Sequence, residues 1–148
     1  MRKLFALLLV MAVLPLMADA PEWGTTYKQI ESTIKAPVFK SKEYVITKFG
    51  ASTKASAARN QKAINKAIAT CSRKGGGRVV VPAGEWKTGA ITLKSGVNLV
   101  VEKDAKLQFV FDTSLYPLVR TRWEGMDCYN YQPCIYGDSV TNVGITGE

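Results

Sequence analysis

Arginine and aromatic residues are concentrated between positions 120 and 131. Arg120 and Arg122 lie beside Trp123, and the stretch from Tyr129 to Tyr131 follows shortly after. A guanidinium can donate two parallel hydrogen bonds to a carboxylate, and an aromatic face gives a ligand an apolar platform. We therefore expect Arg122 and Trp123 above all to contact a ligand that carries a carboxylate. The alternative is a folded-back loop in which Trp123 packs into the flank of the fold and the arginines brace it.

Acidic residues that could act as general acid and base are single and dispersed. Beyond the first 20 residues the aspartates are Asp104, Asp112, Asp127 and Asp138, with no Asp-Asp pair, and the chain contains no histidine. Glu124 and Asp127 are three residues apart, but isolated acids are mostly surface groups, so we expect them to be loop carboxylates and ion-pair partners of Arg120 or Arg122. The sequence therefore assigns no catalytic residue.

The three cysteines allow one candidate disulfide. Cys128 and Cys134 are close enough in sequence to pair in an oxidising compartment. Cys71 lies on the apolar face of an expected helix, where it would act as a small buried hydrophobe. No metal site is expected, because the chain has no histidine and no Cys-x-x-Cys. No cofactor is expected either, since Gly75–Gly77 follows a helix and lacks the Gly-Lys-Ser/Thr ending of a phosphate-binding loop.

The first 20 residues have the pattern of a secretory signal peptide. Arg2 and Lys3 precede an apolar run, and Ala18-Asp19-Ala20 provides the small residues of a cleavage site. The apolar run is too short to cross a bilayer, so no membrane span is expected. We therefore predict export to the periplasm or the extracellular space.

The whole chain carries a formal charge of +8. Cleavage after Ala20 would remove two basic residues and one acidic residue, and so leave +7. Export argues against a nucleic-acid partner, and the lysines are spread along the chain rather than clustered. A soluble basic surface and attraction to an acidic polymer both remain open.

The pattern of elements predicts one helix followed by many short strands. Residues 21–43 are expected to form an extended lead-in, with a strand at Glu43–Phe49. Asn60–Ser72 should be helical, because Ile64, Ala67, Ile68 and Cys71 make one apolar stripe that ends at the glycine run. Short β-prone segments then follow, at 79–81, 90–93, 97–101, 107–110, 133–136 and 142–145.

A sandwich, a barrel and a β-solenoid all fit this list of strands. The solenoid is favoured because no Asn-Gly or Asp-Gly hairpin turn separates the strands. In a solenoid the helix would cover the open first coil. No cap for the last coil is visible before Glu148, so we expect the fold to continue beyond this sequence.

Several segments resemble the opening of the family 28 glycoside hydrolases, the polygalacturonases. They are Ile46–Ala51, Asn60–Ile64 with Ala67-Ile68, Gly75–Gly84, Thr88–Ser95, Val97–Leu99, Ala105–Leu107, Tyr116-Pro117, Thr121–Gly125 and Tyr131. The segment from Thr121 to Gly125, with Tyr131, looks like the bacterial-type members. Ser52–Arg59 departs from the family pattern in a loop. The resemblance implies a right-handed parallel β-helix with an N-terminal capping helix over residues 44–148, truncated after its first coils.

The resemblance also implies inverting hydrolysis of α-1,4-galacturonosyl bonds in pectin. It makes an acidic sugar the expected ligand of Arg122 and Trp123, at one end of the sugar-binding cleft. The family's catalytic motifs are Asn-x-Asp, Asp-Asp, Gly-His-Gly and Arg-x-Lys, and none occurs here. We therefore expect an N-terminal part of such an enzyme that is inactive by itself. A non-catalytic β-helical module that binds polysaccharide is an alternative, and so is a pectate lyase or epimerase on the same fold, although no acidic cluster for calcium is seen.

Overall fold

The computed structural model of the chain describes residues 23–147. Two compact units divide at Ala36 and Pro37. The predicted signal peptide lies outside the described residues. Within those residues, no helix has both the length and the apolar character needed to cross a membrane.

The first unit contains helix α2 (Trp23–Thr33). The prediction of an extended lead-in over 21–43 is therefore wrong for these residues, although 34–41 contains neither helix nor strand. Pro37 lies beyond the end of α2, where its missing amide hydrogen does not interrupt the hydrogen bonds of the helix. Near that end, the hydroxyls of Ser32 and Thr33 donate to the carbonyls of Gln29 and Ile30, each at 2.7 Å.

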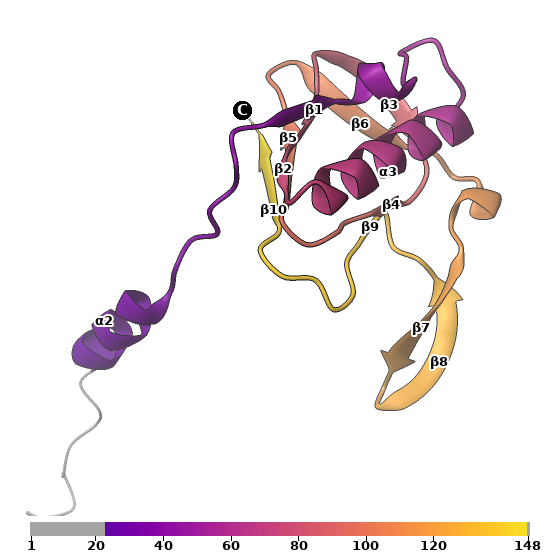
Figure 1. The fold of residues 1–148 in the computed structure, drawn as a ribbon. Coiled ribbons are helices and arrows are strands. Elements are labelled where there is room, and N and C mark those ends of the chain that lie inside the picture. Colours follow the sequence, from indigo (N-terminus) through magenta and orange to yellow (C-terminus); the bar gives the residue numbers. More distant parts are fainter. Residues whose placement is uncertain (1–22, 148) are drawn as a thin grey trace, which may run out of the picture. The chain divides into compact units, whose positions relative to one another are not determined.

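The second unit is a parallel β-helix (Figure 1). Its largest sheet has the order β1-β2-β5-β10, and β3 pairs with β6 and β4 with β9, all in parallel. The chain therefore winds through β2, β3 and β4, then through β5, β6 and β9, and begins another coil at β10. The strands are β1 (Glu43–Val45), β2 (Gly77–Val81), β3 (Gly84–Thr88), β4 (Ile91–Thr92), β5 (Val97–Val101), β6 (Ala105–Phe109), β9 (Ile135–Tyr136) and β10 (Gly144–Gly147).

Apolar side chains at matching positions of successive coils fill the interior. Val79 aligns with Leu99, and Trp86 aligns with Leu107 in the neighbouring sheet. Val79, Leu99 and Trp86 are at most 3% exposed. Stacked strands thus bury like residues above one another, which explains why the short β-prone runs recur along the sequence.

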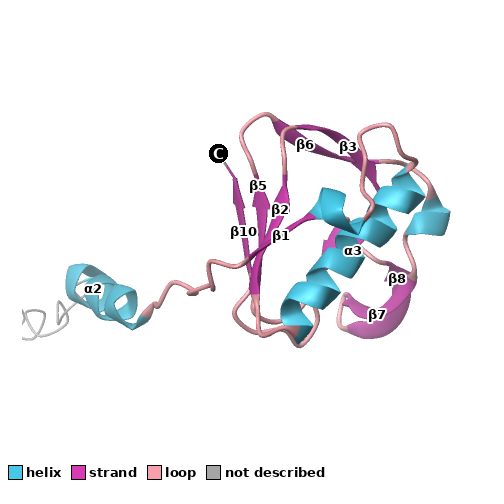
Figure 2. Cartoon of the chain, turned by 45° about the horizontal axis from the view of Figure 1, so that its top comes forward, coloured by secondary structure: helices cyan, strands magenta, loops and turns pink. Residues whose placement is uncertain are grey.

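Helix α3 (Ala57–Arg73) covers the first coil, as Figure 2 shows. It confirms the predicted helix and begins three residues earlier, after the N-cap Ser56, whose hydroxyl accepts from the Arg59 amide at 3.4 Å. The predicted apolar stripe is buried, including Ile64, Ile68 and Cys71 at 0% exposure. At the other end, the Gly76 amide donates to the Cys71 carbonyl at 2.9 Å, and the glycine run leads into β2.

Two strands differ from the sequence prediction. The strand expected over Glu43–Phe49 stops at Val45 and continues as a 3₁₀ helix, η2 (Ile46–Phe49), because the chain turns at Gly50, which has φ +101°. Strand β3 was not expected: it begins at Gly84, and its buried Trp86 and Thr88 alternate with exposed Glu85 and Lys87. This alternation is a strand signal that the sequence prediction overlooked.

Candidate functional site

An antiparallel hairpin interrupts the second coil. Strands β7 (Leu118–Trp123) and β8 (Met126–Tyr131) lie between β6 and β9 and project from the β-helix (Figure 1). The insertion is visible in the register: Gly84 pairs with Ala105, 21 positions later, whereas Ile91 pairs with Ile135, 44 positions later. The candidate site is therefore carried on an added element rather than on the coils themselves.

A two-residue turn joins the hairpin strands. Its central residues, Glu124 and Gly125, have φ values of 48° and 86°. Positive φ at both positions is typical of the type I′ turn, which matches the twist of paired antiparallel strands. The sequence analysis looked for Asn-Gly and Asp-Gly at such turns and so missed Glu-Gly.

A buried glutamine anchors the foot of the hairpin. Gln132 is 5% exposed. Its backbone amide donates to the Pro117 carbonyl at 2.8 Å across the base of the two strands. Its side-chain nitrogen donates to the Thr92 hydroxyl at 3.0 Å. These bonds tie the hairpin to β4, and the sequence offered no signal that this glutamine would be buried.

The hairpin has two faces of different chemistry, because successive side chains of a strand point to opposite sides. We call one the arginine face; it consists of Leu118, Arg120, Arg122, Asp127, Tyr129 and Tyr131. The other is the tryptophan face, which consists of Val119, Thr121, Trp123, Met126, Cys128 and Asn130. Arg122 and Trp123, which the sequence analysis expected to act together, therefore lie on opposite faces.

Asp127 holds the two arginines of the arginine face. Its Oδ2 accepts from Nη2 of Arg120, and its Oδ1 lies 3.9 Å from Nε of Arg122. Arg122 Nη2 also donates to the Gly125 carbonyl at 3.1 Å. The expected ion pairing is thus found for Asp127, whereas Glu124 forms the turn. The three side chains are 70%, 71% and 54% exposed, and ion pairs this exposed contribute only about 0–1 kcal/mol.

Trp123 does not pack into the flank of the β-helix. It is 67% exposed and borders a hollow with Met126, Asp127, Cys128 and Asn130. The alternative of a folded-back, braced loop is therefore wrong: the segment is a regular hairpin that extends into solvent.

A largely apolar cavity of about 330 Å³ lies at the foot of the arginine face. Tyr131 lines it together with Phe109, Val110, Phe111, Asp112, Thr113, Tyr116 and Cys134. The Tyr116 hydroxyl donates to the Val110 carbonyl at 2.9 Å. Burial, together with the neighbouring Cys134, raises the pKa of Tyr116 above its ordinary value. Because Tyr131 belongs to both, the cavity adjoins the arginine face at its foot.

The predicted disulfide is not formed. Cys128 and Cys134 are both free. Cys128 lies within β8, opposite Thr121, whereas Cys134 follows the hairpin and lies beside Tyr116. Cys71 is buried as predicted, and burial raises the pKa of its thiol.

The carboxylates of the β-helix serve local structure. Glu43 lies 3.4 Å from Arg78, Glu85 lies 3.9 Å from Lys106, and Asp112 accepts from the Ser114 amide at 3.0 Å. Among residues 23–147, no three histidine, cysteine or acidic side chains gather where they could hold a metal ion.

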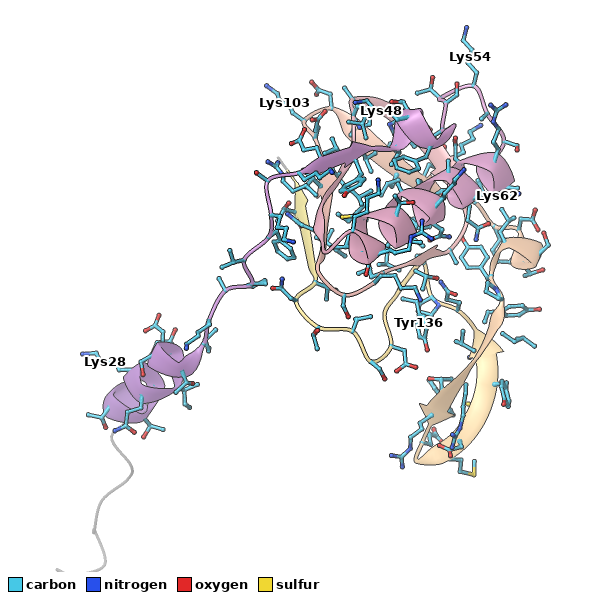
Figure 3. The ribbon with its side chains drawn as sticks, in the orientation of Figure 1. Lys28, Lys48, Lys54, Lys62, Lys103 and Tyr136 are labelled. Atoms are coloured by element: carbon cyan, nitrogen blue, oxygen red, sulfur yellow. The ribbon has the colours of Figure 1, made fainter. Side chains whose placement is uncertain are left out.

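Basic side chains are spread over different elements. Lys48 on η2, Lys54 in the following loop, Lys62 on α3 and Lys103 in the β5–β6 turn point outward (Figure 3). This dispersion agrees with the sequence, which showed no compact basic cluster. Arg120 and Arg122 of the hairpin differ from these lysines, because both contact the same carboxylate, that of Asp127.

Known proteins with the same fold include two exopolygalacturonases. No protein-family model matches the chain. The exopolygalacturonase of Thermotoga maritima superposes with a TM-score of 0.73 at 35% identity, over 81% of this chain and 27% of that one. The family 28 exopolygalacturonase of Yersinia enterocolitica gives 0.63 at 30% identity, over 73% and 20%. A probable polygalacturonase of Vitis vinifera is 34% identical over 97 residues, which are 60% of this chain and 20% of that protein.

These similarities concern both the fold of the chain and its sequence. The described β-coils form a right-handed parallel β-helix of the kind found in the polygalacturonases, with α3 covering its first coil. The chain is similar to a segment of the family 28 glycoside hydrolases, of the bacterial type represented by the Thermotoga and Yersinia structures. It spans about a quarter of the length of the Thermotoga relative.

Proposed function

We propose that the protein to which this chain belongs hydrolyses α-1,4-galacturonosyl bonds in pectin, with inversion. The observation that carries the proposal is the similarity to the Thermotoga exopolygalacturonase, which reaches 35% identity and covers 81% of this chain. A shared β-helix by itself would support only the fold, but similarity at this identity also supports the glycosidase class.

Inverting hydrolysis needs two carboxyl sites about 6.5–9.5 Å apart, one to protonate the leaving oxygen and one to activate water. Glu43, Glu85 and Asp127 are each engaged with a basic side chain instead. We propose that the catalytic acids belong to coils outside this segment, and that the 148-residue chain does not hydrolyse pectin by itself.

Export of the protein is part of the same proposal. Its N-terminal pattern fits a signal peptide, and a polymer such as pectin is degraded outside the cytoplasm. N-terminal sequencing of the protein recovered from a secretion-competent host should give Pro21 as the first residue. Recovery of an intact Met1 from the cytoplasm would contradict export.

Reducing-sugar release from polygalacturonate tests the activity. The protein in its full encoded length should release reducing ends without the ultraviolet absorbance of an unsaturated product, and residues 1–148 alone should release none. Appearance of the unsaturated product would instead indicate a lyase. Tight binding of polygalacturonate with no cleavage by the full-length protein would indicate a non-catalytic binding module.

The hairpin supports a role in sugar recognition. We propose that Arg122 contacts a carboxylate of the substrate. Trp123 lies on the opposite face of the strand, so it does not share that contact. A uronate polymer is negatively charged, so it would attract this chain, whose formal net charge is +8.

A further inference from the structure

We propose that the arginine face and the cavity at its foot form one binding site for a uronic acid unit, in which Arg120, Arg122, Tyr129 and Tyr131 make the contacts and Trp123 makes none. The choice of galacturonate as the ligand rests on the proposed function. The site itself rests on the geometry of the hairpin.

The register of β7 and β8 arranges the arginine face as a row. Arg122 lies opposite Asp127 near the turn, and Arg120 lies opposite Tyr129 in the middle. Leu118 and Tyr131 form the next pair at the foot, where Tyr131 also lines the cavity. Neighbours on one face of a strand are about 7 Å apart. The surface therefore changes from cationic at the tip to aromatic at the foot.

Asp127 shows that both guanidinium groups can reach a single carboxylate. Its two oxygens are shared between Arg120 and Arg122. Each guanidinium has five N–H donors, and Asp127 and the Gly125 carbonyl occupy only some of them. All three side chains are more than half exposed, so the remaining donors can meet a ligand carboxylate from solvent. Asp127 thus holds the positively charged Arg120 and Arg122 side chains close together before a ligand binds, so an anionic sugar does not have to overcome their mutual repulsion.

The tyrosines supply the surface for the sugar ring. Tyr129 is 74% exposed and Tyr131 is 54% exposed, although large aromatic side chains are usually covered. An exposed aromatic face beside hydrogen-bonding groups suits a pyranose, whose C–H face is apolar and whose edge is polar. The adjoining cavity, at about 330 Å³, is at the lower end of the range for small-molecule sites.

Protection from hydrogen exchange can test the site in the full-length protein. The probes are D-galacturonate, which the enzyme cannot cleave further, and D-galactose, which has a hydroxymethyl group in place of the carboxylate. We expect galacturonate to slow amide exchange in the Leu118–Tyr131 peptide in a saturable way, and galactose at the same concentration to have at least about tenfold weaker effect.

Variants on the two faces make the test specific. Arg122→Gln and Tyr131→Ala should each raise the midpoint of the galacturonate titration by about tenfold, and Arg122→Lys should give an intermediate shift, because it keeps the charge but loses the fork. Trp123→Ala changes the opposite face of the same strand and should leave the midpoint unchanged. Arg73→Gln, at the exposed end of α3, also removes one positive charge, but on an element outside the hairpin. It should also have no effect.

A midpoint that shifts with Trp123→Ala but not with Arg122→Gln would overturn the proposal, and so would equal protection by galactose. The outcome is separable from the proposed function. Reducing-sugar release with no protection of the hairpin would refute the site and leave the hydrolase standing. Face-specific protection in a protein that cleaves no pectin would support the site and refute the hydrolase.

Discussion

Asn65 on α3 completes the hydrogen bonding of Thr92 on β4. The Asn65 Oδ1 accepts from the Thr92 amide at 2.8 Å, and its Nδ2 donates to the Ala90 carbonyl at 3.1 Å. Asn60 acts in the same way nearby, since it donates to the Lys87 carbonyl at 3.0 Å. Side-chain amides of the helix thus take the place of a preceding strand for part of the first coil, whose backbone groups would otherwise be unpaired.

Replacing Asn65 by alanine should destabilise the β-helix. The change leaves the Thr92 amide without its acceptor in a partly buried place, which costs about 1–3 kcal/mol in free energy of unfolding. Urea denaturation measures this. Lys66→Ala, the exposed neighbour on the same helix, is the control and should change stability by no more than about 0.5 kcal/mol. Equal effects from the two substitutions would show that the amide bonds are unimportant.

Gly76 should tolerate alanine less well than Gly50. Both have positive φ, +90° and +101°, so alanine is strained at each by about 1–2 kcal/mol. A Cβ at Gly76 would also meet the Gly96 carbonyl oxygen at 2.5 Å, whereas at Gly50 nothing lies within 4 Å. We expect Gly76→Ala to cost roughly 1–3 kcal/mol more than Gly50→Ala in the same denaturation experiment. Matching losses would mean that the turns of successive coils are not in contact.

Thiol labelling should distinguish the three cysteines. In the native protein under non-reducing conditions, the exposed Cys134 should react quickly, the partly buried Cys128 more slowly, and the buried Cys71 only after unfolding. Mass spectrometry of the labelled peptides identifies each site. Failure of Cys128 and Cys134 to react until a reductant is added would restore the disulfide that the structure lacks.

Stability should decline at alkaline pH through Cys71. Burial raises the pKa of its thiol in the folded state, whereas in the unfolded chain it ionises near about 8.5. Above that pH the folded state holds more protons than the unfolded state, so the free energy of unfolding falls as pH rises. Below it, the contribution is fully present. Cys71→Ala should give a shallower decline over this range, and identical slopes would exclude Cys71 as a cause.

Replacing Glu124 by asparagine should stabilise the turn between β7 and β8. Glu124 has φ 48°, a conformation that asparagine adopts more readily than glutamate, and Asn-Gly is the preferred type I′ sequence. Glu124→Asn should therefore slow amide exchange in β7 and β8 by a few fold, while exchange in β2 and β5 stays unchanged. Gly125→Ala should have the opposite effect on the hairpin. Faster exchange in the asparagine variant would argue against this turn type.

Local patterns predicted the parts of the fold that bury one face. The stripe of Ile64, Ile68 and Cys71 predicted α3, because helical periodicity is written directly in the order of residues. The β-prone runs around Val79 and Leu99 predicted strands of successive coils, because short runs of apolar residues are also visible directly in the order of residues. Helix α2 was missed because Pro37 lies a few residues beyond its end, and strand β3 was missed because it begins at Gly84, directly after Pro82-Ala83.

The candidate site shows the limit of such patterns. The sequence by itself determined a capping helix, stacked short strands and a segment rich in arginine and aromatic residues. Only the tertiary structure decided that this segment is a hairpin, that Arg122 and Trp123 face opposite ways, and that Asp127 joins two arginines. The physical reason is that a side chain's direction depends on strand pairing and on contacts between distant residues, such as Gln132 with Thr92, which no local window of sequence contains.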